Sequence, residues 1–191
     1  TNIEVCFSFG LLKEEQLRKV REAGATRAHC NLETSRRYFP EICTTHTYDQ
    51  KIETLKAAVA AGLSICSGGI MGLGETLEDR VDMVLTAKEL GVKSVPVNFL
   101  NPIPGTPYED NKPLTDEEAR QCVAVFRFII PDASIRLAGG RGLLDDKGKE
   151  CFQSGANAAI SGDMLTTAGI TVQKDMEMLK ALGYKPQLWE D

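Results

Sequence analysis

The sequence predicts an α/β fold, a partial TIM-type (βα) barrel with about six of the usual eight βα units. Two observations predict this class. Short strand-like runs alternate with amphipathic segments of helix length along the chain, and most of the predicted strands carry one apolar and one polar face. With 42% hydrophobic and 26% charged residues and no low-complexity linker, the 191 residues are expected to form a single domain over 1–191.

The predicted elements follow one another in strand–helix order. Strands are expected near 3–8, 27–33, 64–70, 94–100, 134–138 and 157–161. Helices are expected near 13–23, 48–61, 77–90, 115–130 and 146–154, and a last helix near 173–182 lies in a short C-terminal tail that begins at about 163. Thr47 with Gln50 and Thr115 with Glu118 have the spacing of capping boxes, which predicts where two helices begin.

The polar faces of the strands are the most informative feature. The apolar faces contain Ile3, Val5 and Phe7, then Ala28, Cys30 and Leu32, then Val95, Val97 and Phe99, and then Ile135 and Leu137. The opposite faces contain Glu4, Cys6 and Ser8, then His29, Asn31 and Glu33, then Ser94, Pro96 and Asn98, and then Ser134 and Arg136, while Ser64, Cys66, Gly68 and Ile70 share a face of the third strand. The inner face of an ordinary parallel barrel is apolar, and each unpaired buried polar group costs roughly 1–3 kcal/mol. We therefore expect a lumen that houses a polar ligand.

Six βα units are too few to close the usual barrel. The chain begins at Thr1 without a methionine, and strand-like residues start at once. We expect a fragment truncated at its N-terminus, in which about two βα units would precede Thr1.

Composition excludes several classes of partner. The net charge is −5 and the basic residues are scattered, which argues against nucleic acid. No apolar run approaches the roughly 20 residues of a membrane span, and no signal peptide is present, so we expect a cytoplasmic protein without a membrane partner. The six cysteines form no CxxC, and in such a protein they are expected to be free thiols or metal ligands.

A glycine-rich turn follows the third predicted strand and leads into a helix. It reads Gly68-x-Ile70-x-Gly72-x-x-Glu75. Glycines allow close approach of a ligand to the backbone, and the following helix N-terminus favours anionic groups. An ordinary βα turn is the alternative, and the spacing does not match the dinucleotide fingerprint.

Two cysteines and an arginine are candidate metal-site residues. Cys6, Cys66 and Arg136 lie on polar faces of different strands, and thiolates are the ligands that iron–sulfur clusters require. Buried cysteine more often serves as packing, so each cysteine taken singly favours that alternative. Cys30 has the opposite parity and is expected to be packing, as are the remaining three cysteines, Cys43, Cys122 and Cys151.

Asn31 and Glu33 present an amide and a carboxylate to one space, which suits ribose hydroxyls or a polar substrate group. A mutually satisfied polar pair is the alternative. Asn98 offers both a donor and an acceptor. His29 and His46, the only histidines, are expected to be hydrogen-bonded structural residues.

Several motifs together resemble those of the biotin synthases, a branch of the radical SAM superfamily. They are CNLETS (30–35), THTYDQKIETL (45–55), CSGGIMGLGET (66–76), SVPVNFLNPIPGTP (94–107), IRLAGGR (135–141) and GAN (155–157). The resemblance runs from about Val5 to Pro186. The glycine-rich turn is similar to the adenine-contacting motif shared by radical SAM enzymes.

The resemblance implies an incomplete barrel in which a 4Fe–4S cluster cleaves S-adenosylmethionine and a second cluster donates sulfur to dethiobiotin. By position, it implies that Cys6, Cys66 and Arg136 bind the second cluster, usually 2Fe–2S. Glu33 stands where an acidic residue holds the cofactor ribose, and Ile70 stands where the adenine packs. Asn31 and Asn98 match substrate-contacting asparagines. The resemblance also implies an electron donor such as flavodoxin or ferredoxin, and it is compatible with a homodimer.

This sequence departs from the family pattern in two ways. The CxxxCxxC loop that binds the radical-generating cluster is absent, so this chain alone should not generate the radical. Cys30 stands where many members carry histidine, which leaves a 4Fe–4S form of the second cluster open.

Three alternatives remain open at this point. Another radical SAM enzyme, such as a hydrogenase maturase or a methylornithine synthase, should lack the trio of Cys6, Cys66 and Arg136. A metal-free aldolase- or isomerase-like barrel would use the glycine-rich turn for phosphate, but it needs a Schiff-base lysine or an acid–base pair on an inner strand face, and we find neither. The third alternative is an inert fragment of the enzyme.

Overall fold

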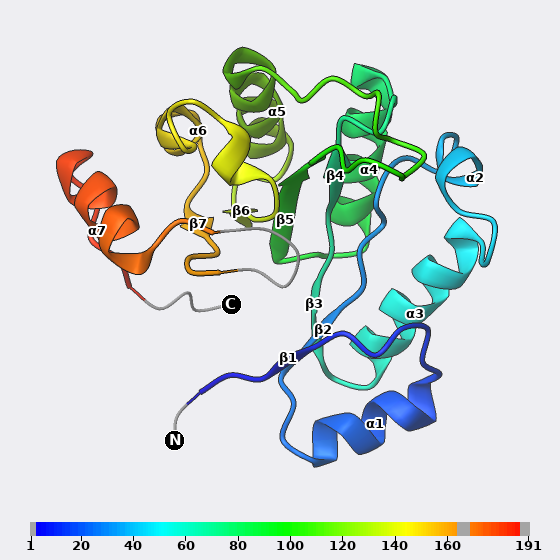
Figure 1. The fold of residues 1–191 in the computed structure, drawn as a ribbon. Coiled ribbons are helices and arrows are strands. Elements are labelled where there is room, and N and C mark those ends of the chain that lie inside the picture. The colour runs from blue at the N-terminus through cyan, green and yellow to red at the C-terminus, as the bar shows by residue number, and fades with distance from the viewer. Residues whose placement is uncertain (1–2, 164–168, 188–191) are drawn as a thin grey trace. The chain divides into compact units, whose positions relative to one another are not determined.

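The computed structural model describes residues 3–163 and 169–187 (Figure 1). The chain divides into two compact units. The first comprises Thr1–Gly69 and Glu75–Pro96, and the second comprises Ile70–Gly74 and Val97–Asp191. The prediction of a single domain over 1–191 stays a prediction.

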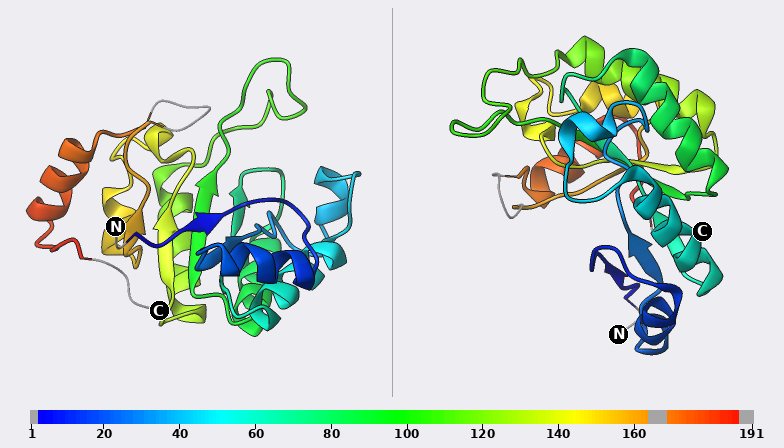
Figure 2. Two further views of the ribbon diagram at one scale, coloured as in Figure 1. Left: turned by 90° about the horizontal axis from the view of Figure 1, so that it is seen from below. Right: turned by 90° about the vertical axis from the view of Figure 1, so that its right-hand side faces the viewer.

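The first unit contains parallel strands and the helices that connect them (Figures 1 and 2). Its strands are β1 (Cys6–Phe7), β2 (Arg27–His29) and β3 (Ser64–Cys66), and the first half of β5 (Ser94–Phe99) pairs with β3. Its helices are α1 (Glu14–Glu22), α2 (Phe39–Ile42), α3 (Tyr48–Ala60) and α4 (Leu77–Glu89). The helix α1 packs beside α3, and α3 packs on β3. Buried Leu17, Leu55, Ile65 and Met83 form part of its core.

The second unit continues the alternation. Its strands are most of β4 (Gly69–Met71), the second half of β5, β6 (Ser134–Leu137) and β7 (Ala158–Ala159). Its helices are α5 (Asp116–Ile129), the 3₁₀ turn η1 (Arg141–Leu143), α6 (Lys149–Gln153) and α7 (Val172–Ala181). The strands β6 and β7 pair in parallel, and the amide of Ala138 donates to the carbonyl of Val97. Buried Val97, Val123, Phe126, Ile135 and Leu137 form part of its core.

Capping residues determine where the long helices begin. Both predicted capping boxes, Thr47 with Gln50 and Thr115 with Glu118, are present at the starts of α3 and α5. A third capping box, in which Thr76 pairs with Asp79, starts α4. It has the same four-residue spacing, with aspartate as the fourth residue, so it too could have been predicted from the sequence.

The prediction of an α/β partial TIM-type barrel is confirmed, because parallel strands alternate with helices as expected. The predicted third strand is in fact two strands, β3 and β4, which pair with the same strand, β5. The predicted last helix is α7, whereas residues 164–168 of the predicted tail lie outside the described residues. Among the described residues, no helix combines the length and the apolar character that crossing a membrane requires.

The predicted apolar face of the first strand is wrong. Ile3 and Val5 are 74% and 48% exposed, and of the predicted trio only Phe7 is buried. The strand is shorter than expected, since its register with β2 includes only Cys6 and Phe7, and residues 3 and 5 lie before the paired part. In the second strand the parity is as predicted, because Ala28, Cys30 and Leu32 are buried.

Candidate functional site

The register of the first unit places two thiols on one face of its sheet. Cys6 lies opposite Arg27, and His29 lies opposite Cys66. Side chains two residues apart on a strand share a face, so Arg27 and His29 point the same way. Cys6 and Cys66 therefore share this face, as predicted.

Cys66 sits among polar groups from both neighbouring strands. Its side chain is buried, and Sγ lies 3.3 Å from Nδ1 of His29. The Cys66 thiol also donates to Oγ of Ser94 at 3.7 Å. His29 is thus hydrogen-bonded, as predicted, but sequence reasoning did not predict that its partner is a candidate cluster ligand. The signal was present in the sequence, because His29 shares the polar face of its strand.

Arg27 is a second residue that sequence reasoning missed on this face. Its Nε donates to Oγ of Ser64 at 3.0 Å, and its side chain is only 11% exposed. Arg27 has the same parity as His29 and lies opposite Cys6. A largely covered guanidinium thus lies on the same sheet face as the two thiols.

The two thiols on this face are of the chemical type that binds an iron–sulfur cluster, but two are too few to hold one. Thiolates suit iron–sulfur clusters, which usually take about four protein ligands. Within residues 3–163 and 169–187, no three or more His, Cys, Asp or Glu side chains are grouped so that they could hold a metal ion. Cys6 and Cys66 can therefore supply part of a ligand set.

Glu33 follows β2 in an unusual backbone conformation. Its φ of 70° lies in the left-handed region, which costs a residue with a side chain roughly 1–2 kcal/mol. Its Oε2 atom is buried and has no hydrogen-bond partner among the described residues. Burial raises the pKa of the Glu33 carboxyl, and the charge on Lys51 and a hydrogen bond from Asn31 oppose that rise. Such a strained, under-satisfied carboxylate fits a site that binds a hydroxyl-bearing ligand.

The backbone of the glycine-rich turn packs tightly against this segment. The amide of Glu33 donates to the carbonyl of Gly68 at 3.0 Å, and the amide of Gly68 donates to Oδ1 of Asn31 at 3.0 Å. A Cβ atom at Gly69 would lie 2.2 Å from the carbonyl oxygen of Glu33, and one at Gly68 would lie 2.0 Å from the carbonyl oxygen of Pro96. Neither position can accept a side chain. The structure thus brings Asn31, Glu33 and Gly68 together.

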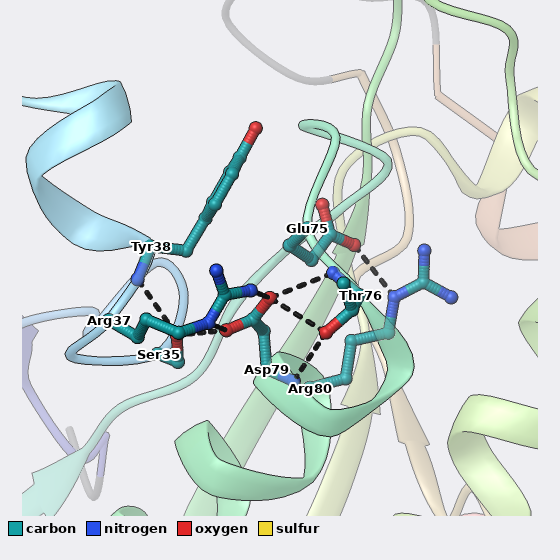
Figure 3. Close-up of polar contacts among 7 residues, drawn as sticks. All are labelled: Ser35, Arg37, Tyr38, Glu75, Thr76, Asp79 and Arg80. Carbon is teal, nitrogen blue, oxygen red and sulfur yellow. Dashed lines mark hydrogen bonds and ion pairs between the residues drawn. The ribbon is translucent and has the colours of Figure 1, made fainter.

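Glu75 ends the turn and lies beside a set of polar contacts at the start of α4 (Figure 3). Oε1 of Glu75 accepts from Nε of Arg80 at 2.7 Å. The carboxylate of Asp79, which is 1% exposed, accepts hydrogen bonds from Ser35, Arg37 and Thr76. We call Ser35, Arg37, Thr76 and Asp79 the Asp79 network. Burial acts to raise the pKa of Asp79, but these hydrogen bonds outweigh it and hold that pKa well below its ordinary range.

The remaining predicted site residues belong to the second unit. Oδ1 of Asn98 accepts from the amide of Gly139 at 2.9 Å. Arg136 is half-buried and lies opposite Ala158 in the β6–β7 pair. Ile70 is half-buried in β4, and the carbonyl of Gly72 accepts from Nδ2 of Asn111 at 2.8 Å.

The other cysteines divide by exposure. Cys30, Cys122 and Cys151 are buried, as packing predicts, and Cys43 is half-buried. Burial raises the pKa of Cys30, and it raises that of Cys151 to about 12. Sγ of Cys43 lies 3.5 Å from Nδ1 of His46 and 3.5 Å from Oγ1 of Thr45.

Comparisons with known proteins agree with this geometry. The model of the Radical SAM superfamily matches residues 2–87, and that of the Biotin and Thiamin Synthesis associated domain matches residues 96–185. A biotin synthase of Brachyspira hyodysenteriae is 60% identical over 187 residues, which are 98% of this chain and 56% of that protein. Biotin synthase 2 of Corynebacterium diphtheriae is 62% identical over 95% of this chain and 55% of its own length. The chain is thus similar to biotin synthases over nearly its whole length. It spans about half the length of these relatives.

Solved structures outside the biotin synthase family share the fold. Methylornithine synthase superposes with a TM-score of 0.81 over 97% of this chain and 59% of its own, at 20% identity. An FeFe-hydrogenase maturase, HydG from Carboxydothermus hydrogenoformans, superposes with a TM-score of 0.82 over 98% of this chain and 48% of its own, at 15% identity. These likenesses concern the fold alone, whereas about 60% identity links the chain to biotin synthases.

Proposed function

We propose that this chain is part of a radical SAM enzyme that inserts sulfur into dethiobiotin to form biotin. The observation that carries the proposal is that Cys6 and Cys66 share one face of the sheet in a chain about 60% identical to biotin synthases. The enzyme's 4Fe–4S cluster and S-adenosylmethionine supply a 5′-deoxyadenosyl radical that removes hydrogen, and its second cluster supplies sulfur. The CxxxCxxC ligands of the first cluster are not in this sequence.

In this proposal the thiols and the arginine hold the sulfur donor. Cys6, Cys66 and Arg136 bind the second cluster, which is 2Fe–2S or, as the alternative form, 4Fe–4S. His29 hydrogen-bonds the Cys66 sulfur and orients it. Ligating side chains are commonly held by such neighbouring hydrogen bonds.

The glycine-rich turn and the end of β2 hold S-adenosylmethionine. Oε2 of Glu33, which has no partner among the described residues, accepts a ribose hydroxyl. Gly68 lets the turn pack against the backbone of Pro96. Gly72 keeps the backbone accessible, Ile70 packs on the adenine, and Glu75 ends the turn. The charge in this part of the proposed site comes from the carboxylate of Glu33, whose Oε2 atom is buried.

Asn31 and Asn98 contact dethiobiotin. Oδ1 of each asparagine already accepts a backbone amide, from Gly68 and Gly139 respectively, so a substrate carbonyl would accept from the side-chain NH₂ group. In Asn31 this group also donates to Glu33 and would bind both. The proposal also includes a cytoplasmic location, an electron donor such as flavodoxin or ferredoxin, and a homodimer.

Anaerobic reconstitution of the full-length protein tests the proposal. Iron and sulfide analysis should show two distinct clusters, and the reconstituted protein should convert dethiobiotin to biotin. The 191-residue chain alone should retain at most a weakened second cluster. A full-length protein that cleaves S-adenosylmethionine but makes no biotin would contradict the proposed substrate. A stable, stoichiometric 4Fe–4S cluster with cofactor cleavage by the 191-residue chain alone would contradict the division of ligands.

A further inference from the structure

The segment that carries Glu33 and the start of α4 are joined by a buried side-chain hydrogen bond (Figure 3). Oγ of Ser35 donates to Oδ1 of Asp79 at 2.5 Å across 44 positions of the sequence. Both residues are 1% exposed. Ser35 lies two residues after Glu33, and Asp79 lies four residues after Glu75. One contact therefore links the segment of Glu33, the proposed ribose-binding residue, with the helix that follows the glycine-rich turn.

Ser35 also organises the chain that follows it. Its Oγ accepts from the amide of Tyr38 at 3.0 Å, and its carbonyl accepts from the amide of Phe39 at 2.9 Å. These bonds fix the turn that follows Glu33 in the sequence and leads into α2. On the near side, the amide of Glu33 is bonded to Gly68. Glu33 is thus held by its own amide bond to Gly68 and by the hydrogen bonds of Ser35, two residues later.

Glu33 needs such restraint because its conformation is strained. A residue with a side chain in the left-handed region relaxes toward extended backbone when its neighbours allow it. Such a relaxation would break the backbone bridge between Glu33 and Gly69 and would move the carboxylate with it. The bond from Ser35 to Asp79 opposes it, because Asp79 is anchored in α4 through Thr76, whose amide and hydroxyl donate to Oδ2 at 2.8 Å and 2.9 Å.

We propose that Ser35 and Asp79 are positioning residues for S-adenosylmethionine, which hold Glu33 in its left-handed conformation at the glycine-rich turn. Neither residue contacts the cofactor in this proposal. The inference rests on the proposed function, since it assigns Glu33 to the cofactor. It predicts that loss of the Ser35 hydroxyl weakens cofactor binding without slowing the turnover of bound cofactor.

The capping role of Asp79 must be separated from this positioning role. Oδ2 caps α4, whereas Oδ1 accepts from Ser35 and from Nε of Arg37. Ser35→Ala removes the bond from Ser35 and leaves the cap intact. Glu118→Gln is a matched control, because Glu118 caps α5 through Thr115 with distances of 2.8 Å and 2.9 Å. Glu118 is exposed and belongs to the second unit.

The test uses the reconstituted full-length enzyme. The dissociation constant of S-adenosylmethionine is measured by equilibrium binding, and kcat and KM are measured for 5′-deoxyadenosine release. We expect Ser35→Ala and Asp79→Asn each to raise the dissociation constant and KM about tenfold, which corresponds to the loss of one hydrogen bond to a charged group. We expect kcat at saturating cofactor to stay within about twofold of wild type, since bound cofactor selects the same conformation. The loss of affinity in the double variant should be smaller than the sum of the two single losses, because the two residues share one hydrogen bond.

Two results would overturn the inference while leaving the proposed function intact. One is wild-type cofactor affinity in Ser35→Ala. The other is an equal loss of affinity in Glu118→Gln, which would mean that general destabilisation is the cause. Failure of the wild-type enzyme to bind S-adenosylmethionine would overturn the proposed function and this inference with it.

Discussion

Nδ1 of His29 lies 3.3 Å from Sγ of Cys66, because the parallel pairing of β2 with β3 sets the two residues opposite each other. Ser94 receives a hydrogen bond from the same sulfur. Among the described cysteines this surrounding distinguishes Cys66 from Cys122, which is buried on the apolar stripe of α5 beside Ala119, Val123 and Phe126. The two thiols should therefore respond differently to the same substitution.

Cys66→Ala in the full-length enzyme should abolish biotin formation and leave cleavage of S-adenosylmethionine partly intact. It removes a ligand of the sulfur-donating cluster and no ligand of the radical cluster. Cys122→Ala is the control, and it should lose only about 1 kcal/mol of stability through packing. Biotin and 5′-deoxyadenosine are measured for both variants. Equal losses of biotin in the two would show that the assignment to Cys66 is wrong.

Arg136→Lys and Arg136→Met separate two roles for the arginine. Arginine stays protonated to a pKa above about 12 and so rarely binds metal. It either coordinates iron as a neutral guanidine or stays charged and hydrogen-bonds the cluster sulfurs. We expect Arg136→Lys to retain the second cluster with altered Mössbauer spectra, since lysine keeps charge and donors. Arg136→Met should retain less of it. Unchanged cluster content and spectra in both variants would point instead to a structural ion pair.

Glu33→Gln should weaken cofactor binding about tenfold while leaving stability unchanged or raising it by about 1 kcal/mol. Burial raises the pKa of the native carboxyl, which means that its charge destabilises the fold at neutral pH. The gain should be present above the raised folded-state pKa, should shrink as the pH falls through that pKa, and should be absent below the unfolded value of about 4.3. Urea unfolding at several pH values measures it. A loss of stability at pH 7 would show that the carboxylate is structural.

Asp79→Asn should show the opposite pH dependence. Its pKa is lowered in the folded state, so its charge stabilises the fold above the unfolded value of about 3.9, and that stabilisation is lost as the pH falls below it. We expect Asp79→Asn to lower the free energy of unfolding by roughly 1–3 kcal/mol at pH 7. The difference from wild type should become smaller toward pH 3. Glu118→Gln should cost less at pH 7, since that side chain is exposed. A loss that did not change with pH would mean that charge is not what Asp79 contributes.

Alkylation rates should rank the thiols of Cys43 and Cys151. Slight burial acts to raise the pKa of Cys43, but hydrogen bonds involving Thr45 and His46 and the charge on Lys51 lower it overall. Burial raises the pKa of Cys151 to about 12. Because the thiolate is the reactive form, iodoacetamide at pH 8 should label Cys43 first and should label Cys151 only after unfolding. Peptide mass spectrometry follows both sites, and early labelling of Cys151 would contradict its burial.

The sequence by itself determined the elements and the faces of most strands. Alternation of apolar and polar residues requires only local geometry, so it predicted that Cys30 is buried and that Cys6 and Cys66 share a face. Capping boxes span four residues, and for the same reason Thr47 and Thr115 were correctly predicted to start helices. The motifs indicated the similarity to biotin synthases.

The tertiary structure alone decided which distant residues meet. Parity fixes a face but not a register, so only the pairing of β2 with β3 brings His29 to Cys66. Ser35 and Asp79 lie 44 positions apart, and no local pattern connects a serine in a loop with the third residue of a helix. The left-handed backbone of Glu33 is also a tertiary property, since a residue with a side chain adopts it only where its surroundings outweigh the strain.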